Sequence, residues 1–311
     1  MGRMAARVDV IVRTKERPDF LERALADIAA QSMTSWRAVV VNDGGRPHEV
    51  EQVVADSSVS DKVHVVHIAP GEGGRCIAAN TGVREADAPL VVLHDDDDLW
   101  HPEFLARTTS WLDAHPDSGA VSVPTEIVYE ERRGSRWVEA DRAPFWAGMS
   151  RISLAEMLVI NRIVPISIVY RRSLHDEVGG YDESLDAVED WEFYLRVLPR
   201  HPIGFIPGTT LAYWTQRPGV TGAAANSMFE LSADHARDDA IVRDRALATW
   251  IATYGPGLPL YLAGIEKRVL ERIAGVSPGN RGRSIVDVSV WRAVRRRLRR
   301  VLRGLRSRST A

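Results

Sequence analysis

The chain has 311 residues, of which 45% are hydrophobic and 26% charged; this composition is typical of a soluble globular protein and predicts one large domain with appendages. The single cysteine, Cys76, excludes a disulfide framework and is typical of a reducing compartment. No leading apolar segment resembles a signal peptide, and no apolar run approaches the roughly 18 residues of a membrane span, so we expect a cytoplasmic protein.

The first hundred residues alternate between apolar runs and amphipathic segments. Apolar runs predict strands at 8–12, 38–41, 63–68 and 90–93, and helical spacing predicts helices at 18–28, 49–55 and 77–86. This alternation predicts a parallel α/β sheet, in which ligands bind beyond the carboxyl ends of the strands. Asp43 and Asp95 both follow such strands, which favours a nucleotide or phosphate site at this edge.

Four consecutive aspartates, Asp95 to Asp98, directly follow the strand at 90–93. Their mutual repulsion at the edge of a buried sheet predicts a cationic partner, most often a divalent metal ion with oxygen ligands. Asp95 and Asp97 are two residues apart, so in an extended chain both side chains point to one side. The alternative is a solvated acidic turn at the start of a helix.

Beyond residue 100 the pattern is mixed. The sequence predicts helices at 104–114 and 189–197 and strands at 120–123, 163–170, 203–206 and 210–214. Residues 137–146 are aromatic and irregular and predict a loop that faces an acceptor molecule. Residues 228–262 look mainly helical, with an interruption at 255–257.

The end of the chain is strongly basic. Residues 281–311 hold eleven arginines and one acid, Asp287, and so carry about +10 in a chain whose net charge is −2. Apolar side chains recur at helical spacing from Val290 to Leu305, with arginines on the remaining face. Over 288–306 this predicts a basic amphipathic helix that binds an anionic membrane surface. A partner-docking helix and a solvated tail are the alternatives; no nucleic acid is expected, since no supporting fold accompanies the charge.

Four blocks of sequence resemble family 2 glycosyltransferases, which are inverting enzymes of the GT-A fold. They are the strand and turn at 10–18, the Val-Asn-Asp-Gly run ending at 44, the Asn-Thr-Gly at 80–82 with the DXD-like aspartates, and the Gly-Gly-Tyr-Asp-Glu to Glu-Asp-Trp segment at 179–191. Each block alone is a weak signal. In this order and spacing, over residues 8 to 215, they make a strong resemblance.

The resemblance implies an α/β, Rossmann-like GT-A fold with a mostly parallel central sheet and a helical C-terminal extension. The glycosyltransferase domain would cover 1–225, with a nucleotide-binding half at about 1–100 and an acceptor half at about 101–225. A helical extension at 226–280 and the basic amphipathic tail at 281–311 would follow.

The resemblance also implies roles at the donor. Asp97 would bind Mg²⁺ or Mn²⁺ bridging the diphosphate of a UDP-, dTDP- or GDP-sugar. Thr14 and Asp43 would contact the base and ribose, although Asp43 is also a turn-forming residue type, and Asp95 would face the ribose or the transferred sugar. The other residues expected to bind the donor are Lys15, Arg17, Arg75, Asn80 and Asp96.

On the acceptor side, the resemblance makes Asp190 the general base that takes a proton from the attacking hydroxyl. The alternative for Asp190 is an acid placed at a helix N-terminus for its charge alone. Glu189, Trp191 and Trp146 would shape the acceptor pocket, with a place in the core equally expected for Trp191.

The sequence departs from the family pattern at three positions or segments. His94 stands at a position that is usually apolar, and Ala79 replaces a basic residue for which Arg75 could substitute. The segment 213–217 lacks the histidine that completes metal or diphosphate binding in many relatives. Arg217 is expected to contact the diphosphate there as a bidentate donor.

Together these features predict metal-assisted transfer of one sugar to an acceptor hydroxyl, with a lipid-linked or cell-surface glycan as acceptor, in the cytoplasm or on the inner face of the cell membrane. A soluble small-molecule acceptor is an alternative. So are a non-catalytic nucleotide-binding scaffold, against which Asp190 argues, and a two-metal phosphoryl hydrolase, for which the sequence lacks a second His and Asp cluster.

Overall fold

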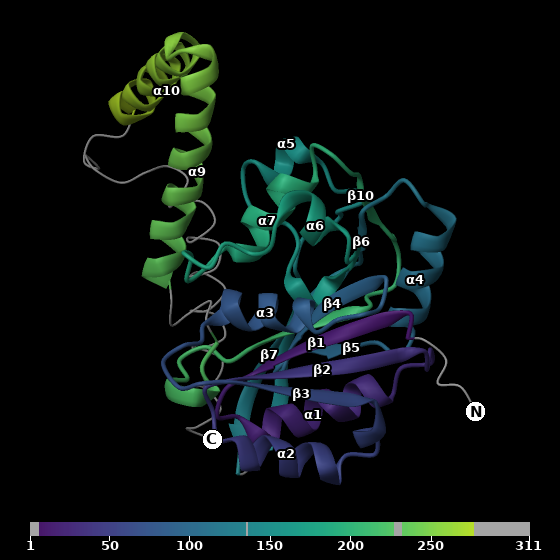
Figure 1. Cartoon of the computed structure of the whole chain (residues 1–311). Coiled ribbons are helices and arrows are strands. Elements are labelled where there is room, and N and C mark those ends of the chain that lie inside the picture. The colour runs from purple at the N-terminus through teal and green to yellow at the C-terminus, as the bar shows by residue number, and fades with distance from the viewer. Residues whose placement is uncertain (1–5, 135, 227–231, 277–311) are drawn as a thin grey trace, which may run out of the picture. The chain divides into compact units, whose positions relative to one another are not determined.

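The computed structural model describes residues 6–134, 136–226 and 232–276 (Figure 1). The chain divides into two compact units, residues 1–242 and 243–311, with the boundary inside helix α9, Ser232–Tyr254. The basic amphipathic tail expected at 281–311 lies outside the described residues.

The first unit is built on a seven-stranded sheet in the order β10-β6-β9-β4-β1-β2-β3. Its strands are β1 (Val8–Thr14), β2 (Trp36–Asp43), β3 (Val63–Ile68), β4 (Leu90–Asp95), β6 (Ala120–Ser122), β9 (Ile168–Arg171) and β10 (Ile203–Phe205). In the spatial order β4-β1-β2-β3, each strand is parallel to the next, and β10 is parallel to β6. Strand β9 runs antiparallel to both of its neighbours, β4 and β6. The mostly parallel α/β sheet predicted from the sequence is confirmed.

Helices cover both faces of this sheet. Helices α1 (Pro18–Ala29) and α2 (Pro47–Asp56) lie on one face, and α3 (Arg75–Arg84) lies on the other (Figure 1). Successive side chains of a strand point to opposite faces, so Val10 packs in the cluster with α1 whereas Ile11 packs in the cluster with α3 and α7 (Glu189–Val197). Every side chain of β1 and nearly every one of β2 is buried, as expected for a parallel sheet covered on both sides.

A second sheet of four strands has the order β5-β11-β7-β8. Its strands are β5 (Leu99–Trp100), β7 (Thr125–Arg133), β8 (Arg136–Pro144) and β11 (Ala212–Gln216). The irregular loop expected at 137–146 is wrong for most of its length, because β8 pairs antiparallel with β7 as an edge strand. Its charged side chains obscure the alternation of a strand, and such charges are common on the exposed edges of sheets.

The remaining elements are short, apart from α4 and the last two helices. They are α4 (Phe104–Ala114), α5 (Leu154–Met157), α6 (Leu174–Val178), α10 (Gly257–Val276) and the 3₁₀ turns η1 (Ser60–Lys62), η2 (Pro165–Ser167) and η3 (Gly222–Ala224). The helices of the described residues include none that is both long and apolar enough to cross a membrane.

A buried ion pair fixes the loop that leads into β4. Asp9, fully buried in β1, accepts hydrogen bonds from Arg37 Nε and Nη2 at 2.9 and 3.1 Å and from the backbone nitrogens of Asp87 and Ala88 at 2.6 and 2.8 Å. One carboxylate therefore ties β2 and the start of β4 to β1.

We expect Asp9→Ala to lower the free energy of unfolding by about 2–4 kcal/mol, because it leaves one buried and one partly buried N–H group without an acceptor and Arg37 without its main partner. Urea denaturation measures this. The matched control is Asp113→Ala, which breaks the exposed Arg7–Asp113 pair and should cost at most about 1 kcal/mol. Equal losses in the two variants would contradict the argument.

Candidate active site

The carboxyl ends of β1, β2 and β4 meet at one edge of the central sheet. Residue pairing places Thr14 beside Asn42 and Arg13 beside Asp95. Asp43, the last residue of β2, follows Asn42 directly. Three residues expected at the donor, Thr14, Asp43 and Asp95, are thus brought together by the sheet.

Asp43 is held by the loop that precedes α3. Its Oδ1 accepts the backbone N–H of Gly74 at 2.9 Å, and Lys15 Nζ lies 3.4 Å from its Oδ2. A Cβ on Gly73 would lie 1.7 Å from Asp43 Oδ1, so only glycine permits this approach. The loop fixes one carboxylate oxygen, and the other stays within reach of the exposed Lys15.

Arg13 connects the end of β4 to the start of α7. Its Nε donates to Asp95 Oδ1 at 2.8 Å and its Nη1 to Glu189 Oε1 at 3.2 Å. Burial acts to raise the pKa of both carboxyls, but Arg13 and Arg75 outweigh burial and hold both pKa values below the ordinary range. Asp95 and Glu189 are therefore ionised at neutral pH.

Asp96 points into the protein. Its carboxylate pairs with Arg17 Nη2 at 2.5 Å and takes a hydrogen bond from the Thr14 side chain. Burial raises the pKa of Asp96 to about 7, against the opposing charge of Arg17. Asp96 orients Arg17 and Thr14, and any effect of this carboxyl on a donor would pass through them.

Within the described residues, the hydrogen bonds and ion pairs of the Asp97 carboxylate all end on one oxygen, while its backbone carbonyl accepts from Arg23 and Thr215. Its Oδ2 accepts from Arg217 Nη2, from Asn226 Nδ2 at 3.0 Å and from Arg17 Nη1 at 3.5 Å. Because Asp96, Asp97 and Asp98 are all buried, the solvated acidic turn considered above is wrong.

The structure corrects the position expected for Arg217. Its side chain is 0% exposed, and its nitrogens donate to Glu130, Thr215, Asp97 and the carbonyl of Ala224. The guanidinium also lies over the rings of Phe20 and Trp137. The structure thus places the Arg217 guanidinium inside the protein, bonded to Asp97, and not on an exposed part of this edge.

The donor set around Asp97 fits a metal ion that arrives with a ligand. Residues 6–134, 136–226 and 232–276 contain no group of three or more His, Cys, Asp and Glu side chains that could hold a metal ion. Mg²⁺ binds proteins through one or two carboxylates and completes its shell with water and substrate phosphates. Asp97, anchored through Oδ2 by Arg217 and Asn226, fits such a single protein ligand.

Asp190 lies at the start of α7 and is 8% exposed. Burial, and then the charge of Glu189, raise the pKa of Asp190 to about 7, against hydrogen bonds from Trp191 N and Asn161 and the charge of Arg75. Val188, the residue before the helix, has φ +56°, which is strained for a β-branched side chain. A buried carboxyl whose pKa lies near neutrality, two residues after a strained backbone position, is a candidate for proton transfer.

Four further residues that the sequence analysis expected to bind the donor or the acceptor lie in different surroundings. Trp191 is buried in the core, with its indole N–H donated to Met157 O at 2.6 Å. Trp146 is partly buried against Arg162, whose guanidinium lies 4.8 Å from the ring centroid. Arg75 begins α3 with its Nη2 3.6 Å from Glu189. Asn80 is bonded to Tyr181 and Glu183 and so fixes the Gly-Gly-Tyr loop.

Four residues that the sequence analysis did not select belong to these networks: Arg13, Glu130, Asn161 and Asn226. Arg13 could have been found, because an arginine is unusual directly after the apolar run at 8–12, within the same strand. The other three lie outside the four blocks that resemble the family, in segments where the hydrophobic pattern does not indicate a site.

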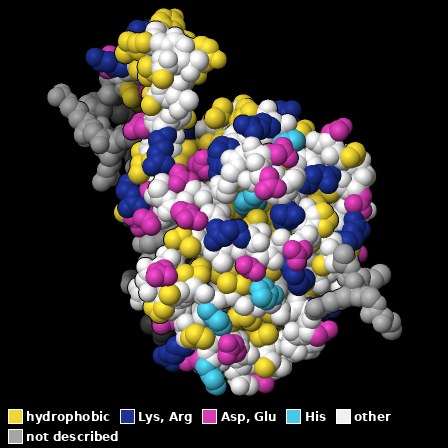
Figure 2. Space-filling model, in the orientation of Figure 1, with side chains coloured by type: hydrophobic (Ala, Val, Ile, Leu, Met, Phe, Trp, Pro, Cys, Tyr) yellow, Lys and Arg dark blue, Asp and Glu magenta, His cyan; other side chains and the backbone are white. Residues whose placement is uncertain are grey.

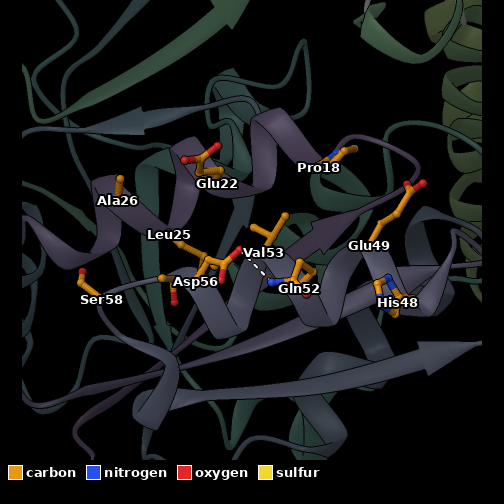
Figure 3. A pocket seen from close by; sticks show the side chains of 11 residues that line it. Pro18, Glu22, Leu25, Ala26, His48, Glu49, Gln52, Val53, Asp56 and Ser58 are labelled. Carbon is orange, nitrogen blue, oxygen red and sulfur yellow. Dashed lines mark hydrogen bonds between the residues drawn. The ribbon is translucent and has the colours of Figure 1, made fainter.

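A separate cavity of about 480 Å³ lies between α1 and α2 (Figure 3). Glu22, Glu49, Gln52 and Asp56 line it, and Gln52 Nε2 donates to Asp56 at 2.9 Å. It contains no residue of the acidic networks described above, so we do not assign the site to it.

Comparison with known proteins identifies the family. The model of glycosyl transferase family 2 matches residues 9–179, more than half of the chain. The chain belongs to glycosyl transferase family 2. The match includes the carboxyl ends of β1, β2 and β4 and ends before Asp190.

Relatives and solved structures agree with this family assignment. An uncharacterized glycosyltransferase of Bacillus subtilis, YwdF, is 26% identical over 212 residues, which are 67% of this chain and 74% of YwdF. Residues 1–349 of S. aureus TarS, crystallised with UDP-GlcNAc, share the fold with a TM-score of 0.56 and 21% identity, over 71% of this chain and 61% of that fragment. A mannosyltransferase of Pyrobaculum calidifontis, PcManGT, in complex with GDP-Man and Mn²⁺, has a TM-score of 0.52 and 19% identity over 94% of this chain and 81% of its own. The GT-A fold expected from the sequence is thereby confirmed.

We expect Arg217→Met to lower the free energy of unfolding by about 3 kcal/mol, since it leaves Asp97 and Glu130 buried without their common partner. Thermal and urea unfolding measure the loss. The control Arg142→Met removes exposed ion pairs with Glu126 and Glu139 and should cost at most about 1 kcal/mol. An Arg217→Met protein as stable as wild type would mean that this guanidinium is not part of the packed cluster.

Proposed function

We propose that this chain transfers a single sugar from a nucleotide-diphosphate sugar to an acceptor hydroxyl by direct displacement, with inversion and with Asp190 as general base. The observation that carries the proposal is the Arg13 bridge. It links Asp95, at the donor edge, to Glu189, the neighbour of Asp190, through contacts of 2.8 and 3.2 Å. A donor and an acceptor would therefore meet beside one rigid network.

In the proposed step the acceptor oxygen attacks the anomeric carbon from the face opposite the leaving group. A carbon–oxygen bond to the acceptor forms, the bond to the nucleoside diphosphate breaks, and the hydroxyl proton passes to Asp190. A general base works best with a pKa near the operating pH, and the pKa of about 7 for Asp190 meets this condition. Asp190 must lose its proton before it can act, so activity should fall as the pH drops below about 7.

On the leaving-group side, Asp97 would bind the divalent metal and Asp95 would face the ribose or sugar. Mg²⁺ or Mn²⁺, when bound, supplies Lewis-acid stabilisation of the charge on the diphosphate. Arg17, 19% exposed and held by Asp96, can add a positive charge at the same edge. Thr14, Asp43 and Lys15 would contact the nucleoside.

The donor base and the acceptor are proposed as classes. TarS was crystallised with UDP-GlcNAc and PcManGT with GDP-Man and Mn²⁺, which supports a nucleotide sugar as donor and a divalent metal. A glycosyltransferase of amylovoran biosynthesis in Erwinia amylovora, AmsE, is 24% identical over 62% of this chain and 70% of its own length. This relative supports a lipid-linked or cell-surface glycan as acceptor; a soluble small molecule is the second candidate.

The first test is calorimetric titration of UDP, dTDP and GDP and of their sugars, with and without Mn²⁺. We expect one nucleotide to bind, to need the metal, and to lose at least about tenfold in affinity in Asp97→Ala, because that variant removes the proposed metal ligand. The matched control is Asp117→Ala, an exposed aspartate, which should bind as wild type does.

In the same assay Asp190→Asn should bind the donor normally but transfer sugar at least about 100-fold more slowly, because the base is lost. If no nucleotide binds under any condition, the donor assignment is wrong, and the nucleotide-binding scaffold is excluded together with the transferase. If Asp190→Asn transfers sugar at the wild-type rate, the assignment of the base is wrong.

We also propose that the C-terminal part of the chain binds an anionic membrane surface, as expected for 288–306. In α10 the exposed apolar side chains recur three or four residues apart, at Leu258, Leu262, Ile265, Val269 and Ile273. Figure 2 shows apolar side chains gathered over α10. An apolar helix face followed by a segment of about +10 charge is suited to lipid with anionic headgroups. A membrane surface of this kind would place the protein on the inner face of the cell membrane.

Vesicle flotation tests this part. We expect the chain to float with vesicles that contain anionic phosphatidylglycerol, to release at high salt, and not to float with phosphatidylcholine alone, because both charge and apolar area contribute. Ile265→Glu should reduce flotation by about tenfold or more, since it places a charge in the apolar face. Equal flotation with both lipids, or none with either, would exclude an anionic membrane surface as the partner.

A further inference from the structure

The segment between α5 and η2 is attached to the start of α7 at two points. Trp191 Nε1 donates to Met157 O at 2.6 Å, and Asn161 Nδ2 donates to Asp190 Oδ2 at 2.9 Å. The first contact joins a buried indole to the end of α5. The second ends on the carboxylate that carries the proposed base.

The amide of Asn161 can face Asp190 in only one way. Its Oδ1 accepts the backbone N–H of Ile163 at 3.1 Å. A backbone N–H can only donate, so the oxygen of the amide must lie on that side. The NH₂ group is therefore the part that meets Asp190, and it meets a carboxylate, which as an anion only accepts.

The carboxylate of Asp190 is held from two sides. Its Oδ1 accepts the N–H of Trp191 at 2.7 Å, and its Oδ2 accepts Asn161. Among the described residues, Asn161 is the only side chain that donates to this carboxylate. Each carboxylate oxygen has two lone pairs, so both can still accept a hydroxyl proton.

We propose that Asn161 is a positioning residue for sugar transfer: it fixes the plane of the Asp190 carboxylate and stabilises its anionic form, so that an acceptor hydroxyl meets an oxygen ready to take its proton. This inference rests on the proposed function, because it requires Asp190 to be the base.

The charged groups around Asp190 make this role visible in a pH profile. After burial, Glu189 on the same helix raises the pKa of Asp190, whereas Trp191 N, Asn161 and then Arg75 of α3 lower it. Tyr194, one turn along α7, is buried, and its pKa lies well above the ordinary range because of burial and the charge of Asp190. It stays neutral over the working range. Loss of Asn161 therefore moves the pKa of Asp190 upwards, and the active form appears at higher pH.

The test is kcat/KM for sugar transfer between pH 5.5 and 9.5, in the full chain, for wild type, Asn161→Leu and Asn161→Asp. For Asn161→Leu we expect the acid limb to move up by about one to two pH units, with about a tenfold loss at pH 7 that is mostly recovered at pH 9.5. Asn161→Asp should shift the limb at least as far, because it places a second carboxylate against Asp190. The affinity for the nucleotide, measured by calorimetry, should change less than about twofold in both variants, since neither touches the donor edge.

Ser153→Ala is the matched control. It removes the Ser153 cap of α5, where Ser153 Oγ accepts Glu156 N at 3.3 Å, and leaves Asn161 in place. A merely structural role for the segment predicts that Ser153→Ala and Asn161→Leu lower the rate equally at every pH. Our inference predicts an unshifted acid limb in Ser153→Ala.

The Asp190→Asn variant separates the role of Asn161 from the proposed function. If Asp190→Asn abolishes transfer but the acid limb of Asn161→Leu stays where it is in wild type, Asn161 does not position the base and the proposed function stands. If Asp190→Asn retains the wild-type rate, the proposed base is wrong and the inference about Asn161 falls with it.

Discussion

The neutralisation of buried carboxylates by arginine is the constraint on which this structure depends. Asp95, Asp96, Asp97 and Glu189 lie close together at one sheet edge, where their repulsion would be strong in a medium of low polarity. Four arginines, Arg13, Arg17, Arg75 and Arg217, offset this charge. Guanidinium groups stay charged at any pH at which a protein folds and donate in a fixed fork, so the geometry of the edge does not change with their protonation.

This arrangement divides the carboxyl groups by environment. Asp95 and Glu189 have low pKa values because arginines outweigh burial, whereas Asp190, with Arg75 as a weaker influence, has a pKa of about 7. Neighbouring acids with separated pKa values are what an enzyme needs when one group must stay charged and another must exchange a proton. The separation arises from which arginine each acid contacts, and Glu189 and Asp190 show that adjacent residues can differ.

The strand and helix pattern of the first hundred residues was predictable because apolar periodicity reports burial directly, and β1 to β4 lie close to their expected bounds. Strand β8 was missed because charged side chains interrupt the alternation of its apolar residues and its partner β7 determines the pairing. The motifs brought Thr14, Asp43, Asp95 and Asp190 into consideration. The motifs did not reveal which side chains contact these residues. Arg217 is buried against Asp97, 120 positions away, and Asn161 contacts Asp190, 29 positions away. Such contacts leave no local signal in one sequence.

The contact of Arg217 with both Glu130 and Asp97 also bears on recombination between relatives. Glu130 belongs to β7, Arg217 follows β11, and Asp97 follows β4. These three residues form one electrostatic unit assembled from three separated stretches of chain. An exchange of the β7–β8 hairpin for one without this glutamate would leave Arg217 without Glu130. A transplanted hairpin should therefore be accompanied by all three side chains, since a chimera that carries only one of them has an unbalanced charge in its interior.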